Sequence, residues 1–455
     1  MCSASAAEAP AASGATRRSG GLARYVFAAT LVRSADGGAV VAIVLLAQHT
    51  GLPAWVSGLL GASITAPHLL GPFISRRLDT ARDGRVVIAV SAVVHGALLG
   101  VAALLLPHTW AAVPAVLLFV SGLFGPMLTG GISSRLPAIA GPSRQHQRRA
   151  QSWDVASYGI SGTLGPAAVA WIAAGPGPLT AALVLAAAAI TGAAAVLALP
   201  RQPPVTDASA VPSPLQTFRQ IWGSGPLRRT LALTVTVAFS VAVLPIYAVA
   251  IAPQFGGAAL AGTLVAGYGV GNLIGSALLM VKPLPGDADR LVVMLCFVVA
   301  AALAVVAAMP SFVAALVACG AAGIANALFF AATLAARSEY APAEARGQVF
   351  IWVGALKIAA GSAGTATAGV LLFGAAWMPV ALVAGVCVLA ALAGARSRAP
   401  RACHARRAPR ARGAGTGTAP LPLPRRRPAS SHDGEPGEHE AGHRPQHQQQ
   451  RRAPG

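Results

Sequence analysis

Three charged side chains stand inside stretches that are otherwise apolar. Arg33 and Asp36 lie within the apolar segment 25–47, and Lys357 lies within the segment 348–373. A charge at the middle of a bilayer costs about 2.5–3.5 kcal/mol on insertion scales, so such residues usually face a partner or a cavity. These three residues are therefore the first candidates for binding a proton or a charged ligand.

Arg33 and Asp36 are three residues apart, so they share one face of a helix and can neutralise each other. One interpretation is a structural ion pair, and the alternative is that Asp36 binds a proton or a cationic substrate beside Arg33. Lys357 lies about 13–14 Å into its helix at 1.5 Å per residue. It can act as a structural partner of Asp36 or contact the substrate directly. His68 and His95, in neighbouring segments, could titrate near neutral pH.

The chain that carries these residues is too apolar for a soluble domain. Of its 455 residues, 55% are hydrophobic and 11% are charged, and the mean hydropathy is +0.63, whereas soluble domains are about 25% charged. Apolar runs long enough to cross a bilayer as helix recur about twelve times. We therefore expect an all-α polytopic membrane protein. The expected transmembrane helices are 25–47, 53–74, 86–106, 111–133, 152–174, 178–199, 230–251, 257–281, 290–309, 311–336, 348–373 and 376–395.

The connections between these helices alternate in charge. The odd-numbered connections contain no Lys, Arg, Asp or Glu, whereas each even-numbered connection carries basic residues. Because basic loops stay on the cytoplasmic side, we expect a multi-pass protein of the inner (plasma) membrane with both termini in the cytoplasm.

A Pro-rich connection in the middle divides the chain into two similar halves. Two similar segments, Arg149-Ala-Gln-Ser-Trp153 and Arg346-Gly-Gln-Val-Phe350, each precede an apolar segment. In the same way, Gly71–Arg85 in the first half corresponds to Gly275–Arg290 in the second. The pattern indicates a parallel repeat of six helices each. The expected parts are a disordered cytoplasmic N-terminus (1–23), a first half (24–199), a cytoplasmic linker (200–229), a second half (230–395) and a disordered basic tail (396–455).

Composition also argues against several classes of function. The net charge of +20 is placed in loops and in the tail, where 13 of the 34 basic residues lie, so no nucleic-acid partner is expected. The basic tail either adheres to anionic lipids or is a solvated extension. The five cysteines are scattered without metal-ligand spacing, and no nucleotide loop or catalytic constellation is present. We expect no enzyme activity, no cofactor and no metal, and a monomer in the bilayer.

Two motifs carry a resemblance to a known family. The stretch Gly71–Arg85 is similar to the Gly-x-x-x-Asp-Arg-x-Gly-Arg signature, with Asp79 or Asp83 in the place of the acid, and Gly162-Thr-Leu-Gly165-Pro166 is similar to an antiporter signature. With its six-plus-six pattern the chain resembles the major facilitator superfamily of transporters. The resemblance implies charge contacts that hold the cytoplasmic side closed. The candidates for this gate are Asp79, Asp83, Arg85, Arg135 and Asp154.

Other candidates follow from the same pattern. Asp154 could instead interact only with the macrodipole of its own helix, because it lies near that helix's first turn. Asn272 and Asn326 supply neutral polar groups for a substrate cavity. Gly162, Gly165 and Pro166 predict close helix packing, as do Gly267, Gly271 and Gly275 in another helix.

The resemblance implies a secondary active transporter that moves a small organic molecule by alternating access. The Gly-Pro motif favours proton-coupled export of drug-like or metabolite cargo. The alternatives are a nutrient uptake symporter or facilitator of the same fold, and a membrane sensor or scaffold that transports nothing. Protons or another coupling ion, the substrate and the lipid bilayer are the expected partners.

Overall fold

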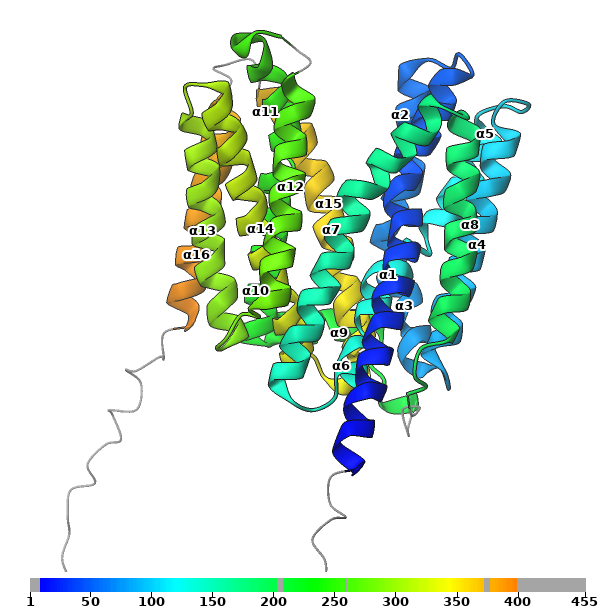
Figure 1. Cartoon of the computed structure of the whole chain (residues 1–455), viewed down its shortest axis with the longest axis vertical. Helices are drawn as coiled ribbons and strands as arrows, with labels where there is room; N and C mark the ends of the chain where they lie inside the picture. The colour runs from blue at the N-terminus through cyan, green and yellow to red at the C-terminus, as the bar shows by residue number, and fades with distance from the viewer. Residues whose placement is uncertain (1–8, 203–207, 258–259, 372–376, 399–455) are drawn as a thin grey trace, which may run out of the picture. The chain divides into compact units, whose positions relative to one another are not determined.

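The computed structural model describes residues 9–202, 208–257, 260–371 and 377–398, and every regular element among them is a helix (Figure 1). The prediction of an all-α polytopic membrane protein is confirmed. Ten of the described helical segments are long and apolar enough to cross a membrane. Two further helical paths complete the expected twelve, one through Ala54–Thr80 and one through Arg144–Ala174.

These two paths are not among the ten long apolar segments, and each has a physical reason. The first path is interrupted by a 3₁₀ turn at Ala66–Leu70, where Pro67 and Pro72 remove backbone N–H donors from the helix ladder. The second path begins with basic and amide residues and contains Pro166 inside the helix. Neither feature prevents a span when neighbouring helices pack around it.

The first half contains eight α-helices and two short irregular turns. They are α1 (Ala9–His49), α2 (Ala54–Thr65), η1 (Ala66–Leu70), α3 (Gly71–Thr80), α4 (Gly84–Leu105), α5 (Ala112–Gly122), η2 (Met127–Gly131), α6 (Leu136–Ala140), α7 (Arg144–Ala174) and α8 (Pro178–Leu197).

The connection between the halves contains η3 (Ala208–Ala210) and α9 (Pro214–Gly223), and the second half follows it. The elements of the second half are α10 (Gly225–Val241), α11 (Leu244–Ile251), η4 (Ala252–Phe255), α12 (Leu260–Val281), α13 (Ala288–Ala308), α14 (Phe312–Tyr340), η5 (Ala343–Ala345), α15 (Arg346–Leu371) and α16 (Met378–Arg398).

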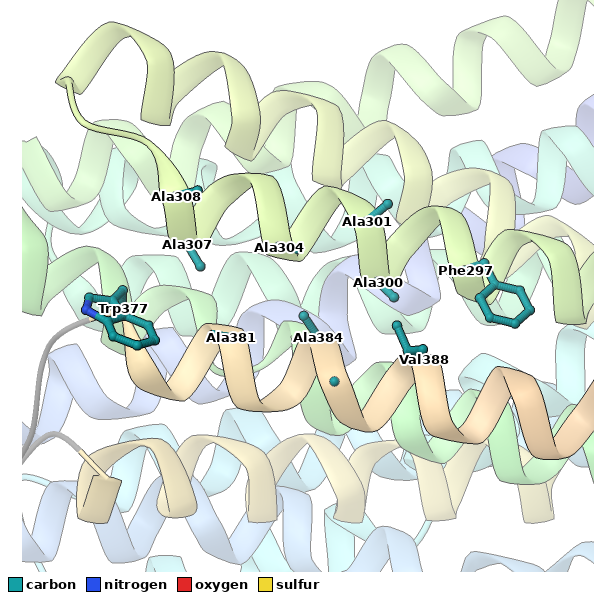
Figure 2. A pocket seen from close by; sticks show the side chains of 11 residues that line it. Phe297, Ala300, Ala301, Ala304, Ala307, Ala308, Trp377, Ala381, Ala384 and Val388 are labelled. Carbon is teal, nitrogen blue, oxygen red and sulfur yellow. The ribbon is translucent and has the colours of Figure 1, made fainter.

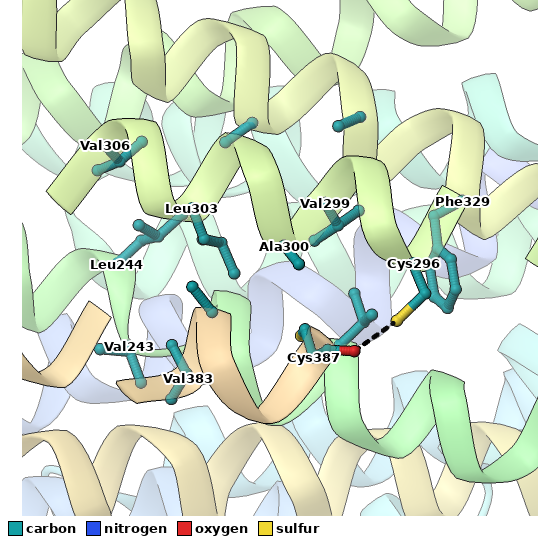
Figure 3. Close-up of a cluster of buried hydrophobic side chains, with 14 of the residues drawn as sticks. Val243, Leu244, Cys296, Val299, Ala300, Leu303, Val306, Phe329, Val383 and Cys387 are labelled. Atoms are coloured by element: carbon teal, nitrogen blue, oxygen red, sulfur yellow. Dashed lines mark hydrogen bonds between the residues drawn. The ribbon is translucent and has the colours of Figure 1, made fainter. Parts of the chain in front are cut away.

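Each half packs around its own core. In the second half a continuous cluster joins α10, α13, α14 and α16, and Figure 3 shows part of it around Leu303 and Phe329. The Cys296 thiol lies 3.6 Å from the Cys387 carbonyl oxygen inside this cluster. These cysteines therefore fill space in the core, as free cysteines usually do.

Close packing of α12 on α14 depends on glycine, as the sequence pattern indicates. A Cβ at Gly271 would lie 2.7 Å from the carbonyl carbon and 2.8 Å from the Cα of Gly320, and one at Gly275 would lie 2.8 Å from the Ala327 Cβ. Gly162 differs from the prediction, because a Cβ there would meet nothing within 4 Å. A spacing of three residues does not keep every glycine of α7 on the packed face.

Some predicted boundaries change. α1 begins at Ala9, within the segment predicted to be disordered, because alanine and arginine there favour helix. The 200–229 connection contains α9, which starts with a capping box between Ser213 and Gln216. The predicted tail begins at residue 396, and its residues 399–455 lie outside the part of the chain that the structure describes.

One end of the helical bundle carries the basic connections. The turns between α3 and α4, α6 and α7, α12 and α13, and α14 and α15 lie there. We call it the basic end. The turns between α1 and α2, α7 and α8, and α11 and α12 lie at the opposite end (Figure 1).

Candidate functional site

Arg33 lies near the middle of α1 and pairs with an acid of α7. Its Nη1 lies 2.8 Å from Asp154 Oδ1, and the two side chains are 2% and 1% exposed. The same nitrogen donates to the Ser157 hydroxyl, and Nη2 donates to Ser133 Oγ at 2.7 Å. The predicted pairing of Arg33 with Asp36 is therefore wrong for this conformation, because Asp154 reaches Arg33 from the adjacent helix.

Both carboxylate oxygens of Asp154 have partners in a buried polar cluster of the first half. Tyr25 donates its hydroxyl to Asp154 Oδ1 at 2.6 Å, and Ser133 donates to Oδ2 at 2.9 Å. A buried carboxylate needs such donors because water is absent. Asp154 thus joins α1, the η2–α6 segment and α7 within the first half. It does not bridge the two halves, which differs from the predicted role in a cytoplasmic gate.

Asp36 lies one helical turn further along α1 and pairs with a histidine. His68 Nε2, in η1, lies 3.4 Å from Asp36 Oδ1, with side chains 3% and 10% exposed. The opposite ring nitrogen of His68 lies 3.1 Å from the Ile64 carbonyl oxygen. Gly125 packs directly on the pair, and a Cβ there would lie 2.5 Å from Asp36 Oδ1. Packing therefore holds the acid and the imidazole together.

Lys357 lies on aromatic rings and does not pair with Asp36. Its Nζ is 4.1 Å from the centroid of Phe330 and 5.8 Å from that of Tyr158. The two rings meet edge to face at 4.9 Å, across the boundary between α7 and α14. Arg33 lies over Tyr158 from the first half, with Cζ 3.6 Å from the ring centroid. Cations attracted to ring faces in this way come together from both halves.

The floor of this charged and aromatic site is a contact layer between the halves. A cluster of buried apolar residues fills it below Tyr158 and Phe330, toward the basic end. Its members are Val155, Leu279, Ala327, Ala331, Leu334 and Phe350.

Asp79 bridges the two halves at the basic end. From the end of α3 its carboxylate accepts hydrogen bonds from the backbone N–H groups of Gly347 at 3.0 Å and Gln348 at 2.9 Å. These donors belong to the first turn of α15, where the helix macrodipole favours a negative charge. Arg135 adds a guanidinium 3.9 Å from the same carboxylate.

A second bridge has the opposite arrangement of charge. Arg148, at the start of α7, lies 2.8 Å from Glu339 Oε1 near the end of α14, and Arg144 lies 3.3 Å from Oε2. Both arginines also donate to the Gly286 carbonyl oxygen, Arg144 at 3.1 Å and Arg148 at 2.9 Å. In the first bridge the acid comes from the first half, and in the second it comes from the second half.

Asp83 and Arg85 stay within the first half. Arg85 Nη2 lies 2.8 Å from Asp83 Oδ2, and Arg201 lies 3.6 Å from the same oxygen. The hydrogen bond from Arg85 holds the pKa of the Asp83 carboxyl below its usual range. Arg85 also donates to the Leu197 carbonyl oxygen at 2.9 Å. The pair therefore ties α4 to the end of α8 and does not reach the second half.

The other residues predicted for the site lie in α7, α12 and α14. Asn272 and Asn326 are half-buried, in α12 and α14. Gly165 has room, since the nearest atom to an added Cβ is 3.8 Å away on Ser34. An apolar groove between α13 and α16, with Trp377 at one end (Figure 2), is separate from the charged site.

Sequence reasoning missed several members of the site. Tyr25 and Ser133 are ordinary polar residues in apolar segments, and nothing in their spacing points to Asp154. Glu339 could have been found as the acid in a basic connection that must face Arg144 and Arg148. Arg337 follows directly after the expected helix 311–336, but in the structure it is 2% exposed in the last turn of α14.

Comparisons with known proteins identify the fold. No family model and no curated protein matches the sequence. Among solved structures the chain is similar to a bacterial homologue of the iron transporter ferroportin in an outward-facing state (TM-score 0.66, 14% identity, covering 83% of this chain and 99% of that one).

Two transporters of other cargo are similar to nearly the same degree. The major facilitator superfamily proton:xylose symporter XylE gives a TM-score of 0.64 at 14% identity, covering 82% of this chain and 95% of that one. The human organic anion transporter MFSD10 gives 0.63 at 14% identity, covering 82% and 99%. The chain therefore has the fold of major facilitator superfamily transporters.

Proposed function

We propose that the chain is a secondary active transporter that moves a small organic molecule by alternating access. The observation that carries the proposal is the charged and aromatic site of Arg33, Tyr158, Phe330 and Lys357, built from both halves above a closed contact layer. A site formed at the interface of two repeats opens to either side when one half rocks against the other.

The proposed state of this structure is closed to the cytoplasm. The basic end is the cytoplasmic side by the positive-inside rule, and the Asp79 and Glu339 bridges join the halves there. Toward the opposite end, Gly162, Leu164, Ser362 and Thr365 are exposed on α7 and α15. The outward-facing state of the ferroportin homologue supports this orientation. We accordingly place the protein in the inner membrane, as a monomer with both termini in the cytoplasm.

Coupling to protons is assigned to Asp36 and its partner His68. An acid and an imidazole held together at the depth of the substrate site can exchange a proton whenever the site opens to water. One proton crossing ~100 mV supplies ~2.3 kcal/mol, which is enough to drive uphill movement of a neutral solute.

We propose export as the direction, because Gly165-Pro166 resembles an antiporter motif. The named cargoes of the similar structures are a sugar, iron and organic anions, so they do not agree on one substrate. Uptake of a nutrient by the same cycle is the second candidate, and a sensor or scaffold without transport is the third. A chain truncated after Arg398 discriminates the third, because a transporter keeps its flux without the tail.

The experiment is flux through proteoliposomes across a substrate panel, with and without a pH gradient. Wild-type flux should respond to the gradient, whereas Asp36→Asn should still exchange substrate but lose that response, because the site can no longer carry a proton. Asp83→Asn is the matched control, since Asp83 is paired within the first half away from the site. A gradient response in Asp36→Asn equal to that of the wild type would remove the assignment to Asp36.

A further inference from the structure

Lys357 carries a charge that no acid of the described chain neutralises. None of the ion pairs among the described residues includes Lys357, and its ammonium group lies over the rings of Phe330 and Tyr158. It is one of only two lysines in the sequence, and the other, Lys282, is exposed after α12. A lysine in the interior of a helical membrane protein usually pairs with an acid or a carbonyl group.

Arg337 adds a second unneutralised cation against the same ring. Its Cζ lies 5.8 Å from the Phe330 centroid and 5.5 Å from that of Phe350. Its Nη2 donates to Thr333 Oγ1 at 3.0 Å, and its buried Nε has no partner. Neutral oxygens and ring faces solvate these charges but do not cancel them.

The charges of the site therefore do not balance. Arg33, Arg337 and Lys357 contribute three positive charges, whereas Asp154 and Asp36 contribute two negative charges, even with His68 neutral. Two further acids lie at the basic end and already have partners, because Asp79 binds α15 and Glu339 binds two arginines. An excess positive charge away from water is costly, and a bound anion would remove that cost.

Only Lys357 is free to meet such an anion. Arg33 is held by Asp154, Ser133 and Ser157. Arg337 lies closer to the basic end, beside Phe350. Lysine has three donors on a flexible stem, so its ammonium group can turn from the ring to a carboxylate. The adjoining faces of Tyr158 and Phe330 offer an apolar surface for the body of the same ligand.

We propose that this site takes an amphipathic organic anion, whose carboxylate pairs with Lys357 and whose apolar or aromatic body lies against Tyr158 and Phe330. The inference rests on the proposed function and names its class of substrate. It gives the aromatic pair and the lysine one shared role, because each meets a different part of one molecule.

The test is uptake into proteoliposomes of matched sets, each an aromatic or medium-chain carboxylate with the carboxamide and the amine of the same skeleton. Uptake by protein-free liposomes is subtracted. We expect carboxylates to be transported at least about tenfold more efficiently than their matched amides and amines. Lys357→Gln should lower carboxylate transport by about tenfold or more, mainly through KM, whereas Lys357→Arg should retain most of it. Lys282→Gln should behave as the wild type.

Each other outcome is informative. If Lys357→Gln takes up carboxylates as fast as the wild type, the anion assignment is overturned. It is also overturned if the wild type transports only amines or amides and Lys357→Gln transports them equally well. Either result leaves the proposed transport function standing. Failure of every member of the panel to move, in vesicles with folded and inserted wild-type protein, contradicts the proposed function itself. Size-exclusion profiles of both Lys357 variants establish that they are folded.

Discussion

At the residue scale, the ion pair between Arg33 and Asp154 explains how α1 and α7 tolerate charges away from water. The guanidinium has oxygen partners from three elements, and the carboxylate accepts from Tyr25 and Ser133 as well. Removing one member of such a pair leaves a buried charge without compensation, whereas replacing both by apolar groups can be nearly neutral.

Asp154→Leu should therefore destabilise the protein by about 3–5 kcal/mol, and Arg33→Met combined with Asp154→Leu should restore much of that loss. Thermal unfolding in detergent, followed by tryptophan fluorescence, measures both variants. Arg201→Met is the control, because Arg201 is 69% exposed and Asp83 is its only ion-pair partner among the residues that the structure describes, so its effect should stay within about 0.5 kcal/mol. A double variant no more stable than Asp154→Leu would contradict the view that the loss comes from leaving Arg33 unpaired.

At the element scale, small residues decide which helices approach each other. Gly267, Gly271 and Gly275 of α12 repeat every four residues and face α14, so that side of the helix lies almost backbone to backbone with its neighbour. Gly262 belongs to the same helix but faces away, since a Cβ there would meet nothing within 4 Å. The two positions form a matched pair for testing the packing.

Gly271→Ala should destabilise the second half by about 1–3 kcal/mol, because the added Cβ would overlap the Gly320 backbone. Gly262→Ala should be neutral or stabilising by up to about 1 kcal/mol, because alanine has the higher helix propensity. Thermal unfolding of the two variants beside the wild type checks the difference. Equal stability of the two would mean that α12 and α14 separate more easily than this packing implies.

The sequence alone predicts the elements better than the partners. Twelve helices follow from hydropathy, because about 20 apolar residues span a bilayer, and the two halves follow from the repeated segments at Arg149 and Arg346. Asp36 and Lys357 are recognisable because charge is rare in these segments. Their partners are not, because pairing depends on rotation and tilt of helices. In the structure, the rotation of the helices pairs Arg33 with Asp154 and Asp36 with His68.

At the scale of the whole molecule, the two bridges at the basic end hold one arrangement of the halves. Asp79 accepts from the first turn of α15, and Arg148 pairs with Glu339, so opening that end breaks both contacts. The charges of the proposed substrate site lie in the same interface, further from the basic end. In the proposed cycle, binding there and opening at the basic end are linked through the same helices, α7, α14 and α15.

Asp79→Asn should weaken the closed arrangement, because an amide oxygen is a poorer acceptor than a carboxylate. Hydrogen bonds to charged groups contribute about 1.5–3 kcal/mol each, so the population should shift by about tenfold or more toward opening at the basic end. Asp83→Asn removes an acid from the same loop without touching the second half, and it should leave the population unchanged.

The most direct test of alternating access is the pulsed electron-spin distance across each end of the bundle, in protein whose native cysteines are replaced. Labels at Arg82 and Glu344 report on the basic end, and labels at Gln48 and Gln254 report on the opposite end, because all four side chains are exposed. In Asp79→Asn the distance across the basic end should lengthen while the distance across the opposite end shortens. Distances that stay fixed in every variant, or that lengthen together at both ends, would contradict a transporter that opens to one side at a time.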